Sequence, residues 1–166
     1  MWQKSLPNKD ELNSCLSYYC HVGDVTDRKT RVSLKLLANI LQEPFYKQLR
    51  TVEQLGYAVG SGYAVWTASI GLLISIQSER DPTYCETRLD AFLEMMAGYF
   101  RNLPHKDFEE RKSALIVDLE GTDQNLEGEG LRFWREIKSG YNDFRSREYT
   151  NWCSDIPIYD LICRTT

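Results

Sequence analysis

Apolar and polar residues alternate in the first part of the chain, and the spacing then becomes helical. Between Leu12 and Val22 the alternation predicts a strand. One face of this strand carries Leu16, Tyr18, Cys20 and Val22. After Gly23, apolar side chains recur every three or four residues from Val32 to Leu41, as on the buried face of a helix. A strand followed by a helix, capped by Asp24 or by Thr26–Asp27, is therefore predicted.

A proline and a glycine divide the next stretch. Glu43–Pro44 is predicted to interrupt the helix, because the residue before a proline is pushed out of the α region. A second short helix is then expected from Pro44 to Arg50. Two strands are predicted after Gly56, at Tyr57–Trp66 and Ser69–Ser78, and their short connection makes them antiparallel neighbours.

The second half of the chain has a mainly helical pattern. Asp81–Pro82 supplies an N-cap and a first-turn proline, and the apolar stripe that follows runs to Pro104, which ends one helix and starts the next. The acidic, glycine-rich segment Gly121–Gly130 is interpreted as a loop, and a last helix is predicted from Leu131 to Gly140. Residues 142–166 show no clear period.

This order of elements predicts an α+β fold, in which a mainly antiparallel sheet has helices packed on one side. The chain of 166 residues is long enough to form one sizeable core. We therefore expect a single domain over residues 1–166. The lead-in at 1–11 and the tail at 146–166 are the parts for which the pattern predicts no structure.

The most distinctive segment is Arg50–Tyr57, where a helical end passes into an aromatic strand; we call it the elbow. Gly56 is expected to end the helix in the left-handed C′ conformation. Such an elbow places Arg50 and Tyr57 at the rim of the sheet, where both can donate hydrogen bonds to a carbonyl or an oxyanion. The structural alternative is that Arg50 pairs with Glu53 across one helical turn and Tyr57 fills the sheet edge.

Four further residues are secondary candidates around the elbow. Glu53 and Gln54 could orient the Arg50 and Tyr57 pair, although a helix-surface carboxylate is the simpler interpretation of Glu53. Tyr63 could help to bind a substrate. His21 could act as an acid or a base if it is buried near Tyr57, and a hydrogen-bonded structural histidine is the alternative.

Composition and charge narrow the classes of function. With 42% hydrophobic and 27% charged residues, the chain matches an ordinary soluble domain. Its net charge is −4 and its basic residues are scattered among acids, so nucleic acid is not an expected partner. No apolar run approaches the roughly 18 residues of a membrane span, and the first residues lack the apolar core of a signal peptide. We expect no membrane contact and a cytoplasmic location.

Cysteine and histidine usage argues against a metal site. The five cysteines form no CxxC pair and are interpreted as reduced thiols. The two histidines, His21 and His105, lie in different segments, and neither H-x-x-E-H nor H-E-x-x-H occurs. We therefore predict no metal ligand and no cofactor.

Several segments together resemble a known family. They are FYKQLRTVEQLGYA at 45–58, the strand pair ending at Glu79, the helix beginning Tyr84-CETRLDAFL, and FWREI at 133–137. Over roughly residues 6 to 145 the chain resembles the last domain of the inverted-zinc-motif metallopeptidases, in the insulin-degrading-enzyme and pitrilysin branch. The R-x-x-E-Q-L-G-Y run is the most specific part, because the charged helical end and the glycine-aromatic junction must both agree.

The resemblance implies a role for the elbow and a metallopeptidase-like domain fold. In that family the zinc, its ligands and the general base lie in the first domain, while an arginine and a tyrosine from the last domain reach the peptide carbonyl. The matching residues are Arg50 and Tyr57. The family enzymes have four such domains or pair them as subunits, whereas this chain resembles one.

Three functions follow as hypotheses. The first is a catalytically incomplete peptidase module that binds a peptide or a partner chain, with a zinc-bearing partner subunit supplying the metal; the chain alone would have no zinc peptidase activity. The second is a peptidase domain recruited as a small metal-independent biosynthetic enzyme or a binding protein for a carbonyl-bearing small molecule. The third is a non-catalytic interaction subunit. A homo- or hetero-oligomer is expected, because domains taken from larger assemblies leave apolar surface to be covered.

Overall fold

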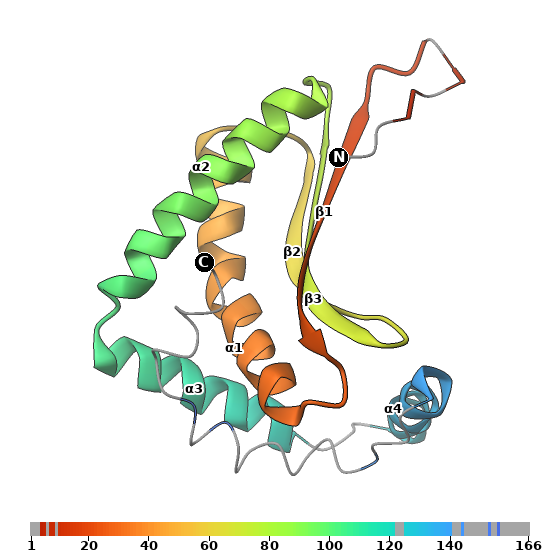
Figure 1. The fold of residues 1–166 in the computed structure, drawn as a ribbon, viewed down its shortest axis with the longest axis vertical. Helices are drawn as coiled ribbons and strands as arrows, with labels where there is room; N and C mark the ends of the chain where they lie inside the picture. The colour runs from red at the N-terminus through yellow and green to blue at the C-terminus, as the bar shows by residue number, and fades with distance from the viewer. Residues whose placement is uncertain are drawn as a thin grey trace.

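The computed structural model describes residues 4–5, 7–8, 10–121 and 125–140 and the single positions 144, 153 and 156. Figure 1 shows the elements in chain order. They are β1 (Ser14–Asp24), α1 (Arg28–Phe45), the π-helix η1 (Tyr46–Val52), β2 (Ala58–Val65), β3 (Ser69–Ser78), α2 (Pro82–Arg101), α3 (His105–Glu120) and α4 (Leu126–Ser139).

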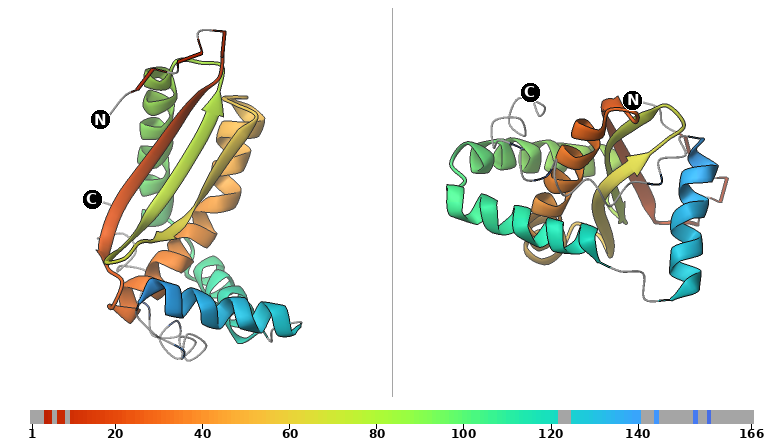
Figure 2. Two further views of the ribbon diagram at one scale, coloured as in Figure 1. Left: turned by 90° about the vertical axis from the view of Figure 1, so that its right-hand side faces the viewer. Right: turned by 90° about the horizontal axis from the view of Figure 1, so that it is seen from below.

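The three strands form one antiparallel sheet in the order β1-β3-β2. In the central strand β3, Ile76 pairs with Leu16 of β1 on one side and with Val59 of β2 on the other. Helices α1 and α2 lie against one face of this sheet, and α4 lies beyond the end at which β2 turns into β3 (Figures 1 and 2). The predicted α+β class with an antiparallel sheet is confirmed.

The core lies between the sheet and the helices, as the periodicity predicts. The inward face of β3 contributes four almost fully buried side chains, namely Ile70, Leu72, Ile74 and Ile76. The alternation of β1 is also confirmed, because its predicted apolar face packs against this core while Cys15, Ser17, Tyr19 and His21 are exposed. Phe45 and Phe92 join α1 to α2 in an edge-to-face contact with ring centroids 5.2 Å apart.

The prediction that Glu43–Pro44 interrupts the first helix is wrong. Helix α1 continues through Pro44 to Phe45 and passes directly into η1. Pro44 removes one hydrogen-bond donor from the helix. Phe45 and Leu49, which follow it, are only 1% and 0% exposed, and the burial of these side chains offsets the lost hydrogen bond and keeps the chain helical before and after Pro44. After Pro44 the hydrogen bonds widen, as when the Glu53 amide donates to the Gln48 carbonyl at 2.9 Å.

The predicted loop at Gly121–Gly130 is wrong in its second half. Helix α4 begins at Leu126, because the Asn125 side chain accepts a hydrogen bond from the Gly128 amide at 2.8 Å and caps the first turn. This cap outweighs the low helix propensity of the glycines in the first turns. Most of the predicted tail and part of the predicted lead-in lie outside the described residues, although Cys153 and Ile156 are described and belong to the core.

Candidate functional site

The elbow has an unusual backbone, and the residue in the left-handed region is Gln54, with φ of 50°. The prediction that Gly56 takes this conformation is therefore wrong. Gly56 is needed for a different reason, since a Cβ atom built there would lie 2.0 Å from the Gln77 carbonyl oxygen of β3. The close approach of two backbones, and not the φ angle, excludes a side chain at this position.

Leu55 fixes the elbow between η1 and the sheet. Its side chain is 2% exposed, and its amide donates to the Leu49 carbonyl at 2.9 Å. Its own carbonyl accepts a hydrogen bond from the Ser78 hydroxyl at 2.5 Å, in a buried position. Leu55 is thus fixed through its side chain, its backbone N–H and its carbonyl, and the residues on either side of it have little conformational freedom. The elbow is therefore preorganised before any ligand binds.

Arg50 and Tyr57 lie on either side of this anchored segment. Arg50 is half-buried in the last turn of η1, and Tyr57 is 58% exposed just before β2. Within the described residues, neither side chain makes a hydrogen bond or an ion pair. Both donors are thus available to an external acceptor, as the carbonyl-binding hypothesis requires.

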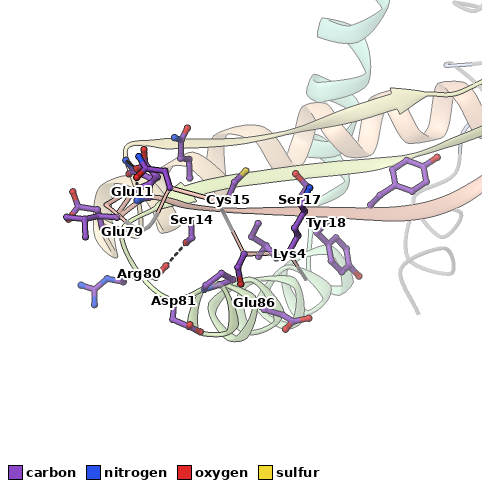
Figure 3. Close-up of a pocket in the computed structure, with 18 residues that line it drawn as sticks. Lys4, Glu11, Ser14, Cys15, Ser17, Tyr18, Glu79, Arg80, Asp81 and Glu86 are labelled. Carbon is purple, nitrogen blue, oxygen red and sulfur yellow. Dashed lines mark hydrogen bonds between the residues drawn. The ribbon is translucent and has the colours of Figure 1, made fainter. Parts of the chain in front are cut away.

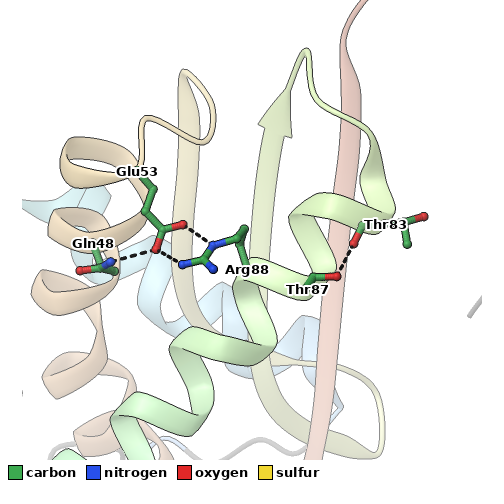
Figure 4. A network of polar contacts seen from close by, with 5 residues as sticks. All are labelled: Gln48, Glu53, Thr83, Thr87 and Arg88. Atoms are coloured by element: carbon green, nitrogen blue, oxygen red, sulfur yellow. Dashed lines mark hydrogen bonds and ion pairs between the residues drawn. The ribbon is translucent and has the colours of Figure 1, made fainter.

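Glu53 is held by Arg88 of α2 and by Gln48 of η1 (Figure 4). Its carboxylate receives Arg88 Nε at 2.8 Å and Nη2 at 2.9 Å, and it also accepts from Gln48 Nε2 at 2.8 Å. The hydrogen bonds from Arg88 are the main reason that the pKa of Glu53 lies below its ordinary value; burial raises this pKa and the Gln48 bond lowers it further. The structural alternative of an Arg50–Glu53 pair is therefore not observed.

The other two candidates lie far from the elbow. His21 is exposed and faces Gly71 of β3, whereas Ala58, next to Tyr57, faces Gln77. Gly71 and Gln77 are six residues apart along β3, which corresponds to about 20 Å at about 3.3 Å per residue. His21 is therefore not buried near Tyr57.

Tyr63 is likewise six residues along the chain from Tyr57, toward the hairpin end of β2. Its ring has Lys35 Nζ 5.6 Å from the centroid, and burial raises the pKa of its phenol. Arg50, Glu53, Gln54 and Tyr57 thus all belong to the elbow segment, whereas Tyr63 lies further along β2.

A groove on the opposite side of β3 was not predicted from the sequence. It has a volume of about 1220 Å³ and lies between the lead-in, the start of β1 and the first turn of α2 (Figure 3). Ser14 fixes its edge by donating to the carbonyls of Ser78 at 3.1 Å and Arg80 at 2.6 Å. Carboxylates outnumber cations along it, and the charged residues are Lys4, Glu11, Glu79, Arg80, Asp81 and Glu86.

Two absences hold for the described part of the chain. No group of three or more His, Cys, Asp or Glu side chains there is arranged to hold a metal ion. No helix among the described residues is both long and apolar enough to cross a membrane.

The chain is similar to known proteins in two respects, the first being architecture. The structure of pitrilysin superposes with a TM-score of 0.79 at 24% identity, covering 94% of this chain and 17% of that one. A peptidase M16 inactive domain from Pseudomonas fluorescens superposes with a TM-score of 0.59 at 16% identity, covering 91% of this chain and 37% of that one. The fold is therefore that of an M16 peptidase domain.

The second respect is sequence. The insulin-degrading enzyme of Homo sapiens is 33% identical over 151 residues, covering 90% of this chain and 15% of that protein. The family model described as PQQ synthase PqqF-like, C-terminal lobe domain 4, matches residues 36–134, which include the elbow. The chain therefore belongs to the M16 insulinase/pitrilysin family, as a C-terminal-lobe domain, and it spans about 15% of the length of such curated relatives.

Proposed function

We propose that this domain is a catalytically incomplete peptidase module that binds a peptide carbonyl at the elbow. The observation that carries the proposal is the pair of unpaired donors, Arg50 and Tyr57, on a backbone anchored by Leu55. A cation and a phenol fixed before binding cost little reorganisation when a carbonyl arrives. Membership of the M16 family supports the proposal, and the existence of an M16 domain described as inactive gives it a precedent.

The chemistry assigned to the pair is stabilisation of negative charge on a carbonyl oxygen. A zinc-bearing partner subunit would supply the metal and the attacking water, and no step is assigned to the described residues beyond hydrogen bonding. In enzymes with preorganised donors of this kind, removing one typically costs about 3 to 4 kcal/mol of transition-state stabilisation. A ground-state peptide gains less from the pair, because its carbonyl carries only partial charge.

The proposal is tested by binding of fluorescently labelled insulin B chain, followed by anisotropy. Arg50→Met is expected to weaken binding about tenfold or more, and Tyr57→Phe about threefold to tenfold, since a hydrogen bond to a charged group is worth more than one to a neutral group. Arg111→Met removes an arginine that pairs with Glu43 on the helical side and serves as the matched control. Equal affinity of all four proteins contradicts the proposal.

The same assay also tests catalytic incompleteness. With zinc added, the purified chain is expected to leave the insulin B chain intact. Stoichiometric zinc binding together with cleavage would show that the module is complete and the proposal wrong.

A second candidate is a metal-independent enzyme or binding protein for a carbonyl-bearing small molecule. The description of the matching family model, a PQQ synthase PqqF-like domain, favours a biosynthetic setting for such a role. A metal-free activity that is lost in both Arg50→Met and Tyr57→Phe, with the fold unchanged, would select this candidate. Indifference of any such activity to both substitutions would reject it.

Association with a second copy or with a partner subunit is part of the proposal. Leu131, Trp134 and Ile137 share one stripe of α4 and are 54%, 58% and 49% exposed, which is unusual for large apolar side chains in a row. Sedimentation at high concentration is expected to show self-association that Trp134→Ser weakens, and a strictly monomeric profile leaves only a non-identical partner. A cytoplasmic location also stays a proposal and is tested by cell fractionation.

A further inference from the structure

Glu53 follows one arginine, Arg50, by three residues in the chain, and it binds a different one, Arg88 of α2. Arg50 precedes Glu53 by three residues within a helical segment, a spacing at which an arginine and a carboxylate commonly pair. Arg88 comes from α2, 35 residues further along the chain, and takes the carboxylate instead. We propose that Arg88 is a positioning residue, which occupies Glu53 and thereby keeps the Arg50 guanidinium free for a carbonyl.

The contacts show why Arg88 holds the carboxylate. Its Nε and Nη2 make parallel bonds to the two carboxylate oxygens, the geometry in which a guanidinium binds most strongly. Gln48 Nε2 fills a further acceptor position on Oε1. The Glu53 side chain is 15% exposed and that of Arg88 is 36% exposed, so water competes only partly for the pair.

The backbone of the elbow helps to direct Glu53 toward α2. Gln54 directly after it is in the left-handed region, a conformation that costs a non-glycine residue about 1 kcal/mol or more. The fixed positions of Leu55 and Gly56 against β3 maintain this turn. Glu53 is also the C-cap of η1, where the wider helical turn differs from the α-helical spacing at which Arg50 would reach it.

The inference gives Arg88 a role at a distance from the ligand. Arg88 touches no proposed substrate, and its effect passes through Glu53 to Arg50. If Arg88 is removed, the vacated carboxylate is expected to attract the nearest unpaired cation in its own segment, which is Arg50. The elbow would then bind its own arginine and lose a donor, while the core beneath it stays intact.

The ion-pair exchange is tested without any ligand, by following the titration of the Glu53 carboxyl carbon with ¹³C NMR. Four proteins are compared: wild type, Arg50→Met, Arg88→Met and the double variant, with Arg111→Met as the control for loss of an unrelated arginine. Arg50→Met is expected to leave the Glu53 pKa unchanged. Arg88→Met should raise it only part of the way to its ordinary value, and the double variant should complete the rise, because Arg50 replaces Arg88 in the single variant.

The Arg50 side chain gives a second, independent measurement. Its Nε–H signal is expected to exchange with water more slowly in Arg88→Met than in wild type, since an ion-paired guanidinium is protected. Identical Glu53 titrations in Arg88→Met and the double variant, together with unchanged Arg50 exchange, would overturn the inference.

The consequence for binding depends on the proposed function and is measured with the same insulin B chain probe. Arg88→Met is expected to weaken binding about as much as Arg50→Met does, about tenfold. Adding Glu53→Gln to Arg88→Met should restore most of the affinity, because a neutral amide cannot hold Arg50 as an ion pair. A purely structural role for the Glu53–Arg88 pair predicts no such rescue, so its absence contradicts the inference.

The two proposals fail in distinguishable ways. If Arg50 binds no carbonyl, none of the variants changes the affinity for the peptide, yet the titration difference remains. If Arg88 does not control Arg50, then Arg50→Met still weakens peptide binding, but Arg88→Met leaves the Arg50 exchange rate and the affinity at the wild-type level.

Discussion

At the scale of single residues, the partner of each charged side chain decides what it can do. Glu53 is the clearest case, because its carboxylate is bound by Arg88 of α2 and not by the neighbouring Arg50. The sequence suggests the local pair, since Arg50 is three residues away. Nothing in the sequence around Glu53 points to Arg88, which reaches it only because α2 packs beside the elbow.

The stability of the protein in acid is expected to depend on Glu53. Hydrogen bonds from Arg88 and Gln48 lower its folded-state pKa below the unfolded-state value. The pair therefore stabilises the fold fully above about pH 4.5, and this contribution is lost as the pH falls through the lower folded-state pKa. Urea unfolding between pH 6 and pH 3 should show a steeper loss of unfolding free energy for wild type than for Glu53→Gln.

The matched control for this prediction is Glu94→Gln, which changes an exposed carboxylate on the same helix as Arg88. Its unfolding free energy should follow the wild-type pH dependence. Parallel curves for wild type and Glu53→Gln would mean that the pair contributes nothing to folding.

At the scale of elements, the elbow is held in place because β2 pairs with β3 and the Leu55 carbonyl accepts a hydrogen bond from Ser78 at the end of β3. Sequence patterning predicts the two helical segments and the two strands, because each has a regular apolar spacing of its own. It does not predict that the helix passes through Pro44. It also assigns the left-handed conformation to Gly56, whereas Gln54 adopts that conformation and Gly56 makes the close contact with β3. These features arise from the packing of Phe45, Leu49 and Leu55 in the core, which local propensity does not contain.

Gly56→Ala is expected to destabilise the protein by about 3 kcal/mol, because the new Cβ would lie 2.0 Å from the Gln77 carbonyl oxygen and a central strand cannot move away. Gly60→Ala, in the neighbouring strand, is the control, since a Cβ there meets nothing within 4 Å. Urea unfolding should place Gly60→Ala near or slightly above wild type. A similar small effect in both variants would contradict the close contact between the elbow and β3.

At the scale of the whole molecule, one core joins residues from both ends of the described chain. Cys153 is 0% exposed and Ile156 is 6% exposed, and the Ile156 carbonyl accepts a hydrogen bond from the buried Lys112 of α3 at 3.4 Å. The sequence shows no period in this region, and the contact is visible only in three dimensions.

The reactivity of the cysteines tests whether the core encloses position 153. Burial raises the pKa of the Cys85 and Cys153 thiols, whereas Cys15 is exposed on β1. Brief alkylation with iodoacetamide, read by mass spectrometry, should modify Cys15 first and should reach Cys85 and Cys153 only in denaturant. Equal rates at Cys15 and Cys153 in the native protein would show that the core does not enclose position 153.

The sequence by itself determined the α+β class, the faces of β1 and β3, the family, and the position of the elbow with Arg50 and Tyr57. These follow from periodicity and from a contiguous motif, both of which are local along the chain. Tertiary structure alone decided that Arg88 holds Glu53, that His21 lies far from Tyr57, and that Gly56 is fixed by β3. Each of these depends on which distant segments meet, because packing brings together residues that no local spacing connects.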